Sequence, residues 1–600
     1  MQSVLNILET RISEAMAKVP GSQGCPALVR PATDAKFGDY QVNGVMPLAK
    51  QLKTNPRKLA EQIAAKLDVS DICEQPEIAG PGFINLRLKP EFVSANLVQV
   101  SKDPSRLGVE KAGKPKTIVV DFSGPNIAKQ MHVGHLRSTI IGDCICRLLE
   151  FESHKVIRQN HIGDWGTQFG MLCALYDEKL LAANQREDSM DESETLADLE
   201  TFYREAQQRF NNDEEFARKA RDSVVALHTG NKVWLAYWEN IVKYSEKHFK
   251  EVYVRLGATL NDRDIRGESF YKDMLGDVVG ELKKRGLAVE SEGAVCVFPV
   301  DSTCSPQAGF KDKEGKPLPV IVQKSDGAYL YATTDLAAIK YRVEKLKADR
   351  IIYVTDARQG LHFEMVFAVA RMAKWVKPET ELVHVTFGSV LGEDGKPLKT
   401  RSGENVKLKE LLDEAVERAR KVVDEKNPEL DAAKKDEIAK AVGIGAVKYA
   451  DYSNNRTSDY IFSFDKMLAM EGNTAPYMQY AYARIKSIER KAVSRDMDIA
   501  TELAGVKKLD LSEPSELDLA KHLIRYGEAV EAAAGDYRPN YLTSYLYDLA
   551  QKFSSFYTDC PVLDASADKR PTRLLLCDLT AKTIEHGLSK LLGIEVIGQM

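Results

Sequence analysis

The sequence contains no Cys-x-x-Cys pair among its nine cysteines. Structural zinc sites and disulfide frameworks depend on closely spaced cysteines, so the sequence predicts neither, and reduced thiols in the cytoplasm fit better. No segment has the length of a membrane span, and the first residues lack the apolar core of a signal peptide. We therefore expect a soluble, cytoplasmic protein that makes no membrane contact.

The sequence also lacks a strong excess of either charge, since 83 Lys and Arg face 88 Asp and Glu for a formal net charge of −5. A chain with this balance has no overall attraction to DNA, and a surface for RNA has to be a local patch. The hydrophobic content of 44% is that of an ordinary globular protein. Because 600 residues are too many for a single hydrophobic core, several domains are expected.

The order of patterns along the chain predicts an α/β protein without internal repeats. Strand and helix patterns alternate after Thr117, which is typical of a parallel, doubly wound sheet. We expect an α+β module over 1–105, a Rossmann-like domain over 116–405 with an insertion at about 183–325, a helical connecting region over 406–465 and an all-α bundle over 466–600. The later helices are predicted at 406–424, 432–450, 475–493, 515–534, 541–557 and 571–592.

The most informative segment covers residues 117–143. An apolar β-branched run ends at a Gly-Pro-Asn turn, a His132-Val-Gly-His135 step follows, and apolar residues then recur with helical spacing. A helix that begins after a parallel strand presents backbone N–H groups at the strand's end, where a nucleotide phosphate binds well. Gly134 lacks a Cβ, so a purine ring can approach the backbone, and Lys129 adds a mobile cation.

Two other interpretations of the histidine pair stay open on spacing alone. The pair is compatible with a surface or core feature, or with zinc helped by Cys144 and Cys146. Those cysteines share no helix face with the histidines, and the Glu of a His-Glu-x-x-His protease is absent. No metal site is therefore predicted.

The segment resembles the "HIGH" signature of class I aminoacyl-tRNA synthetases. With Asp121–Asn126 before it and Leu136–Thr139 after it, it is similar to the arginyl-tRNA synthetases in particular. Three further blocks share this resemblance, at 160–170, 331–335 and 356–363. The resemblance covers nearly the whole chain. It implies a class I catalytic core with an inserted connective domain, an N-terminal module that contacts the corner of tRNA, and a C-terminal bundle that binds the anticodon.

A second ATP-binding loop is expected over Gly392–Gly403. This loop does not match the family's Lys-Met-Ser-Lys-Ser signature, although it keeps Lys399, Arg401 and Ser402. A plain basic hairpin stays open as an alternative. By resemblance, the catalytic residues are His132, His135, Lys129, Lys399 and Arg401, and ATP contacts His132, Gly134, His135, Lys399, Arg401 and Ser402. ATP is expected with Mg²⁺ as a substrate complex, with no tightly bound cofactor.

An arginine pocket needs carboxylates that match the donor fork of a guanidinium. Tyr331 and Asp335 are four apart, so they share a face if this segment is helical, although an ordinary helix start has the same spacing. By resemblance, the arginine-binding residues are Asp121, Asn126, His132, Tyr331, Asp335 and Gln359. The candidate tRNA contacts are Phe83, Asn85 and Met600.

The sequence thus predicts a monomeric ligase that joins L-arginine to tRNA(Arg) through an arginyl-adenylate formed from ATP. Two alternatives are a nucleotidyltransferase that makes a coenzyme and a catalytically silent RNA-binding relative. The first would lack the helical C-terminal half, and the second would have lost the site residues.

Overall fold

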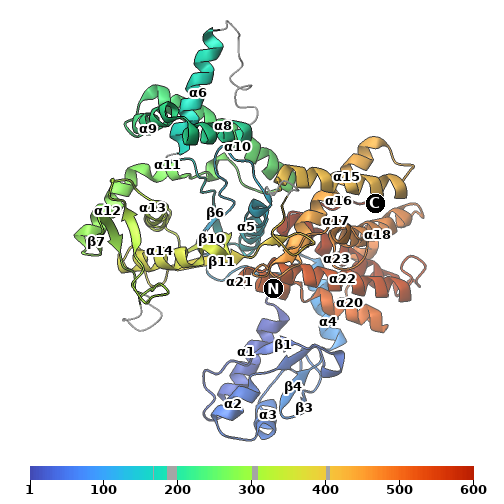
Figure 1. Ribbon diagram of the computed structural model, residues 1–600. Helices are drawn as coiled ribbons and strands as arrows, with labels where there is room; N and C mark the ends of the chain where they lie inside the picture. Colours follow the sequence, from blue (N-terminus) through green and yellow to red (C-terminus); the bar gives the residue numbers. More distant parts are fainter. Residues whose placement is uncertain (167, 186–198, 301–308, 400–405) are drawn as a thin grey trace. The chain divides into compact units, whose positions relative to one another are not determined.

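The computed structural model describes residues 1–166, 168–185, 199–300, 309–399 and 406–600 (Figure 1). The chain forms two compact units. One comprises Gly113–Leu468 with Leu592–Ile594, and the other comprises Met1–Ala112, Ala469–Leu591 and Glu595–Met600. No helix in the described part of the chain is long and apolar enough to cross a membrane.

A four-stranded parallel sheet lies at the centre of the unit that begins at Gly113. Its spatial order is β11-β10-β5-β6, and the strands are β5 (Thr117–Asp121), β6 (Lys155–Gln159), β10 (Arg350–Asp356) and β11 (Glu381–Phe387). The chain leaves β5 toward β6 and returns to β10 on the other side of β5. In an open parallel sheet, this reversal creates a crevice at the carboxyl ends of the two central strands. The predicted α/β fold with a Rossmann-like core is confirmed.

Three helices pack on this sheet: α5 (Val133–Phe151), α13 (Tyr331–Glu344) and α14 (Gly360–Met372). The first packs very closely, because a Cβ added to Gly142 would lie 2.3 Å from the ring of Phe122. On the other side, Leu336 and Val366 are fully buried in one apolar core with Ile351 of β10. Close packing of this kind fixes the helix starts relative to the strand ends.

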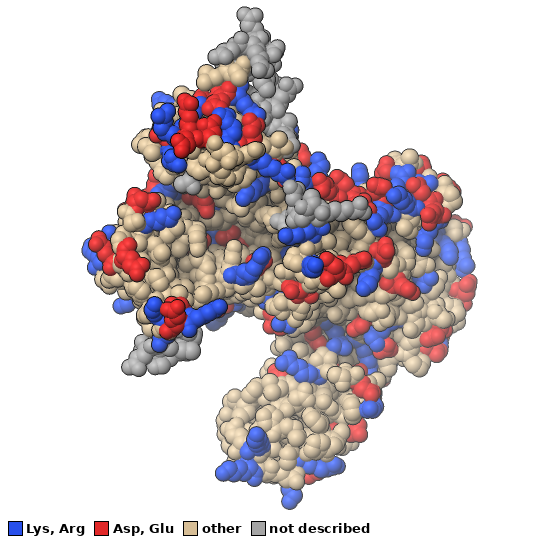
Figure 2. Space-filling model, viewed as in Figure 1, with Lys and Arg blue, Asp and Glu red and all other residues tan. Residues whose placement is uncertain are grey.

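The segment between β6 and β10 forms the insertion. Its first part consists of the helices α6 (Gln168–Gln185), α8 (Leu199–Asn212), α9 (Glu214–His228) and α10 (Lys232–Leu256). Figure 1 shows α6, α8 and α9 gathered together. Acidic and basic side chains are intermixed over this group in Figure 2. The second part has α11 (Glu268–Tyr271), α12 (Leu275–Lys284) and the antiparallel strands β7 (Ala288–Ser291), β8 (Ala294–Val297) and β9 (Val320–Gln323). Val295 and Val320 share the core of α13.

After β11 the same unit becomes helical. It continues with β12 (Val390–Leu391), α15 (Leu408–Lys426), α16 (Ala432–Tyr452), β13 (Tyr460–Ile461) and α17 (Phe464–Met467). A buried ion pair ties this part to α5, since Arg137 Nε lies 2.9 Å from Asp451 Oδ2 of α16.

The other unit combines an α+β module with a helical bundle. The module has an antiparallel sheet of order β1-β2-β4-β3, and its elements are α1 (Val4–Ala17), β1 (Val29–Pro31), β2 (Tyr40–Val42), α2 (Val45–Gln51), α3 (Pro56–Ala64), β3 (Glu77–Ala79), β4 (Phe83–Leu86) and α4 (Pro90–Ser101). The bundle contains α18 (Ala475–Val493), α19 (Ile499–Ala504), α20 (Pro514–Leu523), α21 (Tyr526–Gly535), α22 (Pro539–Asp559) and α23 (Arg570–Glu585). Buried Tyr40 donates a hydrogen bond of 2.6 Å to Glu528 of the bundle.

Two predicted helices differ from those observed. The single helix expected over 515–534 is wrong, because α20 ends at Leu523 and α21 begins at Tyr526. The Tyr545 hydroxyl of α22 donates 3.1 Å to the carbonyl oxygen of His522, which would otherwise accept from the Tyr526 N–H in a continuous helix. The helix expected over 571–592 is α-helical to Glu585 and then continues as the π-helical turn His586–Leu591.

Candidate active site

A cavity of about 670 Å³ opens at the carboxyl ends of β5 and β10. It is the crevice that the strand order creates. Eight of the site residues expected from the sequence line it: Asp121, Asn126, His132, Gly134, His135, Tyr331, Asp335 and Gln359. Lys129 and Lys399 are described but lie outside its lining. Arg401 and Ser402 lie outside the described residues.

The turn after β5 is held in an unusual backbone conformation. Ser123 has φ 75° and Ala128 has φ 61°, and both values are uncommon for residues other than glycine. Asn126, at the exposed tip, rests on Gly163, where an added Cβ would lie 2.3 Å from Asn126 Oδ1. The Gly163 N–H also donates 3.1 Å to the Pro125 carbonyl oxygen. The loop after β6 therefore fixes the turn.

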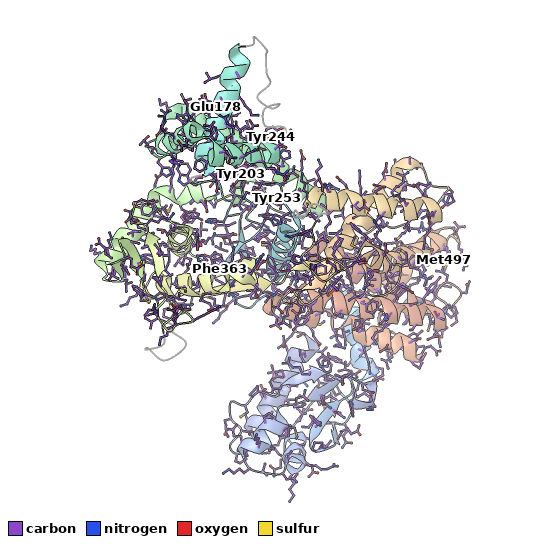
Figure 3. The ribbon with its side chains drawn as sticks, viewed as in Figure 1. Glu178, Tyr203, Tyr244, Tyr253, Phe363 and Met497 are labelled. Atoms are coloured by element: carbon purple, nitrogen blue, oxygen red, sulfur yellow. The ribbon has the colours of Figure 1, made fainter. Side chains whose placement is uncertain are left out.

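Helix α10 of the insertion supports this turn from behind. The Tyr253 hydroxyl lies 2.8 Å from Ser123 Oγ and accepts from Asn160 Nδ2 at 3.0 Å. Asn160 Oδ1 in turn accepts from the Gly124 N–H at 3.0 Å. Figure 3 labels Tyr253 of α10 and also Phe363 of α14, which lines the cavity. A connected network of this kind keeps a strained turn in one conformation.

His132 is the N-cap of α5, and His135 completes a reciprocal capping arrangement. His132 Nδ1 accepts from the Gly134 N–H at 3.0 Å, and His135 Nδ1 accepts from the His132 N–H at 3.2 Å. Because Nδ1 accepts in both rings, the proton of each neutral imidazole is on Nε2. A Cβ at Gly134 would lie 2.8 Å from His132 Cε1, so glycine is needed under this ring.

Both imidazoles are neutral at physiological pH. Burial lowers the pKa of His132, with further lowering by Lys129 and Arg358. Burial, with the neighbouring His132, lowers the pKa of His135 to about 3. The ring centroids are 4.0 Å apart, so a second positive charge there would be repelled. The helix start thus offers two neutral Nε2–H donors together with its own positive dipole end, which suits an anion.

The opposite end of the cavity is acidic. Tyr331 is the first residue of α13, and Asp335 follows one turn later on the same face, as the spacing predicted. His362 of α14 lies between them, with Nε2 2.6 Å from Asp335 Oδ2 and its ring centroid 5.0 Å from that of Tyr331. The exposed Tyr331 ring has room to stack on a planar group.

Glu268 adds a second carboxyl to this acidic end. The start of α11, where Glu268 is the first residue, is fixed by Asp164, which accepts from the N–H and the hydroxyl of Ser269 at 2.8 and 2.6 Å. A Cβ on Gly267 would lie 2.4 Å from the Asp164 carboxyl carbon. Burial, followed by the charges of Asp164 and Asp335, raises the pKa of Glu268 to about 7. Such a carboxyl ionises readily when a cation arrives.

Asp121 closes β5 and lies on the cavity wall, where its Oδ2 accepts from Arg342 Nη2 at 2.7 Å. Gln359 lies on the rim as the residue before α14. Its neighbour Arg358 also lines the cavity, with an exposed side chain that donates to both oxygens of Asp356.

The two described lysines of the expected catalytic set lie outside the cavity lining. Lys129 is exposed and its Nζ lies 4.9 Å from the ring centroid of Tyr203 on α8. Lys399 is exposed after the hairpin that follows β12. Val406, on the far side of residues 400–405, contacts α5, because its carbonyl oxygen accepts from the Val133 N–H at 3.1 Å. Lys129 lies four residues before Val133, the first residue of α5.

The candidate tRNA contacts belong to the unit that contains the bundle. Phe83 is half-buried at the start of β4. Asn85 is buried, and its Oδ1 accepts from Gln41 Nε2 at 2.8 Å, so its amide already has a partner within the sheet. Met600 is half-buried at the end of the chain.

Sequence reasoning missed several polar residues of the cavity, among them Arg358, His362 and Glu268. Arg358 and His362 lie inside the 356–363 block, so that block already carried their signal. Glu268 lies in the insertion, far from every block, and the sequence around it carries no comparable signal.

Three family models match the chain in succession. Residues 6–88 match the arginyl tRNA synthetase N terminal domain, residues 96–464 match the catalytic domain of tRNA synthetases class I (R), and residues 478–600 match the DALR anticodon binding domain. The middle model alone covers more than half of the chain.

Curated and solved proteins agree with these models. The chain is 50% identical over 600 residues to an arginine–tRNA ligase of Cellvibrio japonicus, and the match covers 100% of both chains. Its fold matches the arginyl-tRNA synthetase of Plasmodium falciparum with a TM-score of 0.82 and 30% identity, and that of Thermus thermophilus with a TM-score of 0.80 and 26% identity. Both structural matches cover 100% of each chain. The chain therefore belongs to the class I arginyl-tRNA synthetase family.

Proposed function

We propose that this chain ligates L-arginine to tRNA(Arg) in two steps at the cavity described above. One observation carries the proposal: a single cavity joins a helix start with two neutral imidazole donors to a corner with two carboxyls and an exposed tyrosine ring. The first end suits a triphosphate, and the second suits a guanidinium.

The triphosphate of ATP lies at the start of α5 in this proposal. His132 and His135 donate from Nε2 to the phosphates, and the purine approaches the backbone of Gly134, where the missing Cβ also leaves room for the His132 ring. Lys129, Lys399 and Arg401 supply positive charge, and Ser402 of the second loop contacts ATP. Mg²⁺ arrives with ATP as part of the substrate complex. Donors fixed in advance stabilise the charge that develops at the α-phosphorus.

Arginine lies across the cavity with its guanidinium at the acidic end. Asp335 and Glu268 accept from the guanidinium, and Tyr331 stacks on its plane. Asn126, Gln359 and His132 hold the α-amino and carboxylate groups, which places the carboxylate beside the phosphates. Asp121 lines the wall between the two ends.

The arginine carboxylate then attacks the α-phosphorus of ATP, and pyrophosphate leaves. The product is arginyl-adenylate, and no side chain of the protein forms a covalent bond. In the second step the 2′-hydroxyl of the terminal adenosine of tRNA attacks the carbonyl carbon of the adenylate, and AMP leaves. Catalysis consists of positioning and charge stabilisation.

The remaining assignments extend this proposal. The tRNA corner contacts Phe83 and Asn85, and Met600 lies near the anticodon surface. The domain limits are 1–105, 116–405 with an insertion at about 183–325, 406–465 and 466–600. The protein works in the cytoplasm as a monomer. The eight cysteines in the described residues are free thiols, which suits a reducing compartment.

ATP–pyrophosphate exchange with each amino acid, with and without tRNA(Arg), tests the proposal. We expect exchange with arginine when cognate tRNA is present. Citrulline should fail, because it leaves the carboxylates of the acidic end without a charged partner. Exchange supported by another amino acid, or none with arginine and cognate tRNA, would overturn the assignment.

A further inference from the structure

The first turn of α1 is capped by two glutamates from a distant part of the chain. Glu528 Oε1 accepts from the Leu5 N–H at 3.0 Å. Glu531 Oε2 accepts from Ser3 Oγ at 3.1 Å and from Asn6 Nδ2 at 3.0 Å. Both glutamates belong to α21, where a spacing of three places them on one face. Carboxylates at a helix start are favourable, because they meet its free N–H groups and the positive end of its dipole.

Glu528 also holds the sheet of the N-terminal module. The carboxyl is 8% exposed, and the same Oε1 accepts from the hydroxyl of the fully buried Tyr40 at 2.6 Å. Tyr40 lies in β2, and its neighbour Gln41 lies opposite Asn85 of β4. One carboxyl of the bundle therefore contacts both the first helix of the module and the strand pair that carries the candidate tRNA contacts.

An ion pair repeats this connection at the next residue of the module. Lys521 Nζ of α20 lies 2.9 Å from Asp39 Oδ2, and the same oxygen accepts from the Leu88 N–H at 2.7 Å. Asp39 directly precedes Tyr40, so α20 and α21 contact one stretch of the module together. The module and the bundle belong to one compact unit, and these polar contacts join them within it.

We propose that Glu528 and Glu531 form a clasp that sets the orientation of the N-terminal module on the bundle for tRNA binding. The module supplies the proposed contact with the tRNA corner, and the bundle supplies the proposed anticodon surface. Two sites that are joined rigidly bind one ligand more tightly than the same sites joined loosely, because the second contact then forms at a higher effective concentration. The two glutamates act as positioning residues and do not contact the RNA. This inference rests on the proposed function.

The test compares two RNAs on the full-length chain. Complete tRNA(Arg) spans both sites, whereas its isolated anticodon stem–loop reaches the bundle alone. Three variants loosen the clasp. Glu528→Gln removes the charge at the start of α1, and Tyr40→Phe removes one donor to Glu528. Asn6→Asp replaces an exposed donor with a negative charge beside Glu531.

Glu516→Gln is the matched control. Glu516 is a glutamate of the bundle that is 0% exposed, and its Oε1 accepts from Arg573 Nε at 2.7 Å within the bundle. Each variant is measured for Kd of the two RNAs, for Tm, and for KM of arginine in ATP–pyrophosphate exchange at saturating tRNA(Arg).

We expect Glu528→Gln to raise Kd of complete tRNA(Arg) about tenfold while Kd of the stem–loop changes less than about twofold. Tyr40→Phe and Asn6→Asp should raise Kd of complete tRNA(Arg) about two- to fivefold. The double variant Asn6→Asp with Glu531→Gln should bind complete tRNA(Arg) more tightly than Asn6→Asp alone, because the like charges are then no longer paired. Glu516→Gln should lower Tm without separating the two Kd values. KM of arginine should stay near wild type throughout.

The inference is wrong if the clasp variants leave Kd of complete tRNA(Arg) unchanged. It is also wrong if complete tRNA(Arg) and the stem–loop weaken by the same factor, because the glutamates would then act on the bundle itself. If Glu528→Gln does not fold, Asn6→Asp and its double variant with Glu531→Gln decide alone. Failure of the proposed function is distinguished by the wild-type chain, which would then show no exchange with arginine and tRNA(Arg).

Discussion

The two ends of the cavity differ in how they carry charge. At the α5 start, the lining imidazoles are neutral because burial lowers their pKa, and the proposed cations Lys129 and Lys399 are exposed outside the lining, while Arg358 is an exposed cation within it. At the α13 start, the lining itself carries the carboxyls of Asp335 and Glu268. In the proposed function, the phosphates therefore meet neutral donors and mobile cations, whereas the guanidinium of arginine meets carboxyls that belong to the cavity lining. The two ends are therefore expected to govern different kinetic parameters.

The largest expected effect is at the neutral end. His135→Ala removes one Nε2–H donor and the acceptor that caps the His132 N–H. We expect kcat of exchange to fall by about a hundredfold or more, since such donors act mainly in the transition state. His154→Ala is the control, because His154 is a half-buried histidine whose Nδ1 accepts from the Lys116 N–H away from the cavity. Unchanged kcat in His135→Ala would remove the histidine from this role.

The next effect is at the charged end. Asp335→Asn keeps the shape of the side chain and removes its charge, so KM of arginine should rise by about ten- to a hundredfold while kcat changes less. Asp326→Asn, at an exposed position in the turn before α13, serves as control. Steady-state exchange at varied arginine separates the two parameters. A fall in kcat with a constant KM of arginine would contradict the proposed role of the Asp335 charge in selecting arginine.

The pH dependence distinguishes the two ends further. The pKa of Glu268 is raised to about 7, so this carboxyl gains a proton as pH falls through 7 and then attracts a guanidinium less. We expect KM of arginine to rise several-fold between pH 8 and about pH 6. Glu268→Gln should flatten this profile. Over the same range His135 stays neutral because burial lowers its pKa to about 3, and burial also lowers the pKa of His132, so KM of ATP should change less.

The smallest expected effect concerns Lys129, the exposed cation just before α5. The Tyr203 ring lies below Lys129 Nζ, so Tyr203→Leu removes a cation–π contact that Tyr203→Phe keeps. We expect KM of ATP to change about two- to threefold in the leucine variant and to stay near wild type in the phenylalanine variant, as measured in exchange at varied ATP. Equal effects of both variants would mean that the hydroxyl, not the ring, matters.

The neutral end could be predicted from sequence because it is local. Strand, turn and helix start lie within residues 117–143, and short-range rules fix how they connect. Tyr331 and Asp335 were predicted to share a face for the same reason. By contrast, Glu268 reaches the cavity through the packing of the insertion, and Arg342 reaches Asp121 across 221 positions of sequence. The break between α20 and α21 also depends on a distant side chain, Tyr545.

The most direct test of the comparison measures His135→Ala and Asp335→Asn side by side in ATP–pyrophosphate exchange with tRNA(Arg). The account predicts separate effects: the histidine variant loses kcat with little change in KM of arginine, and the aspartate variant raises KM of arginine with a smaller change in kcat. If both variants change the same parameter by the same factor, the two ends do not act separately and the account is contradicted.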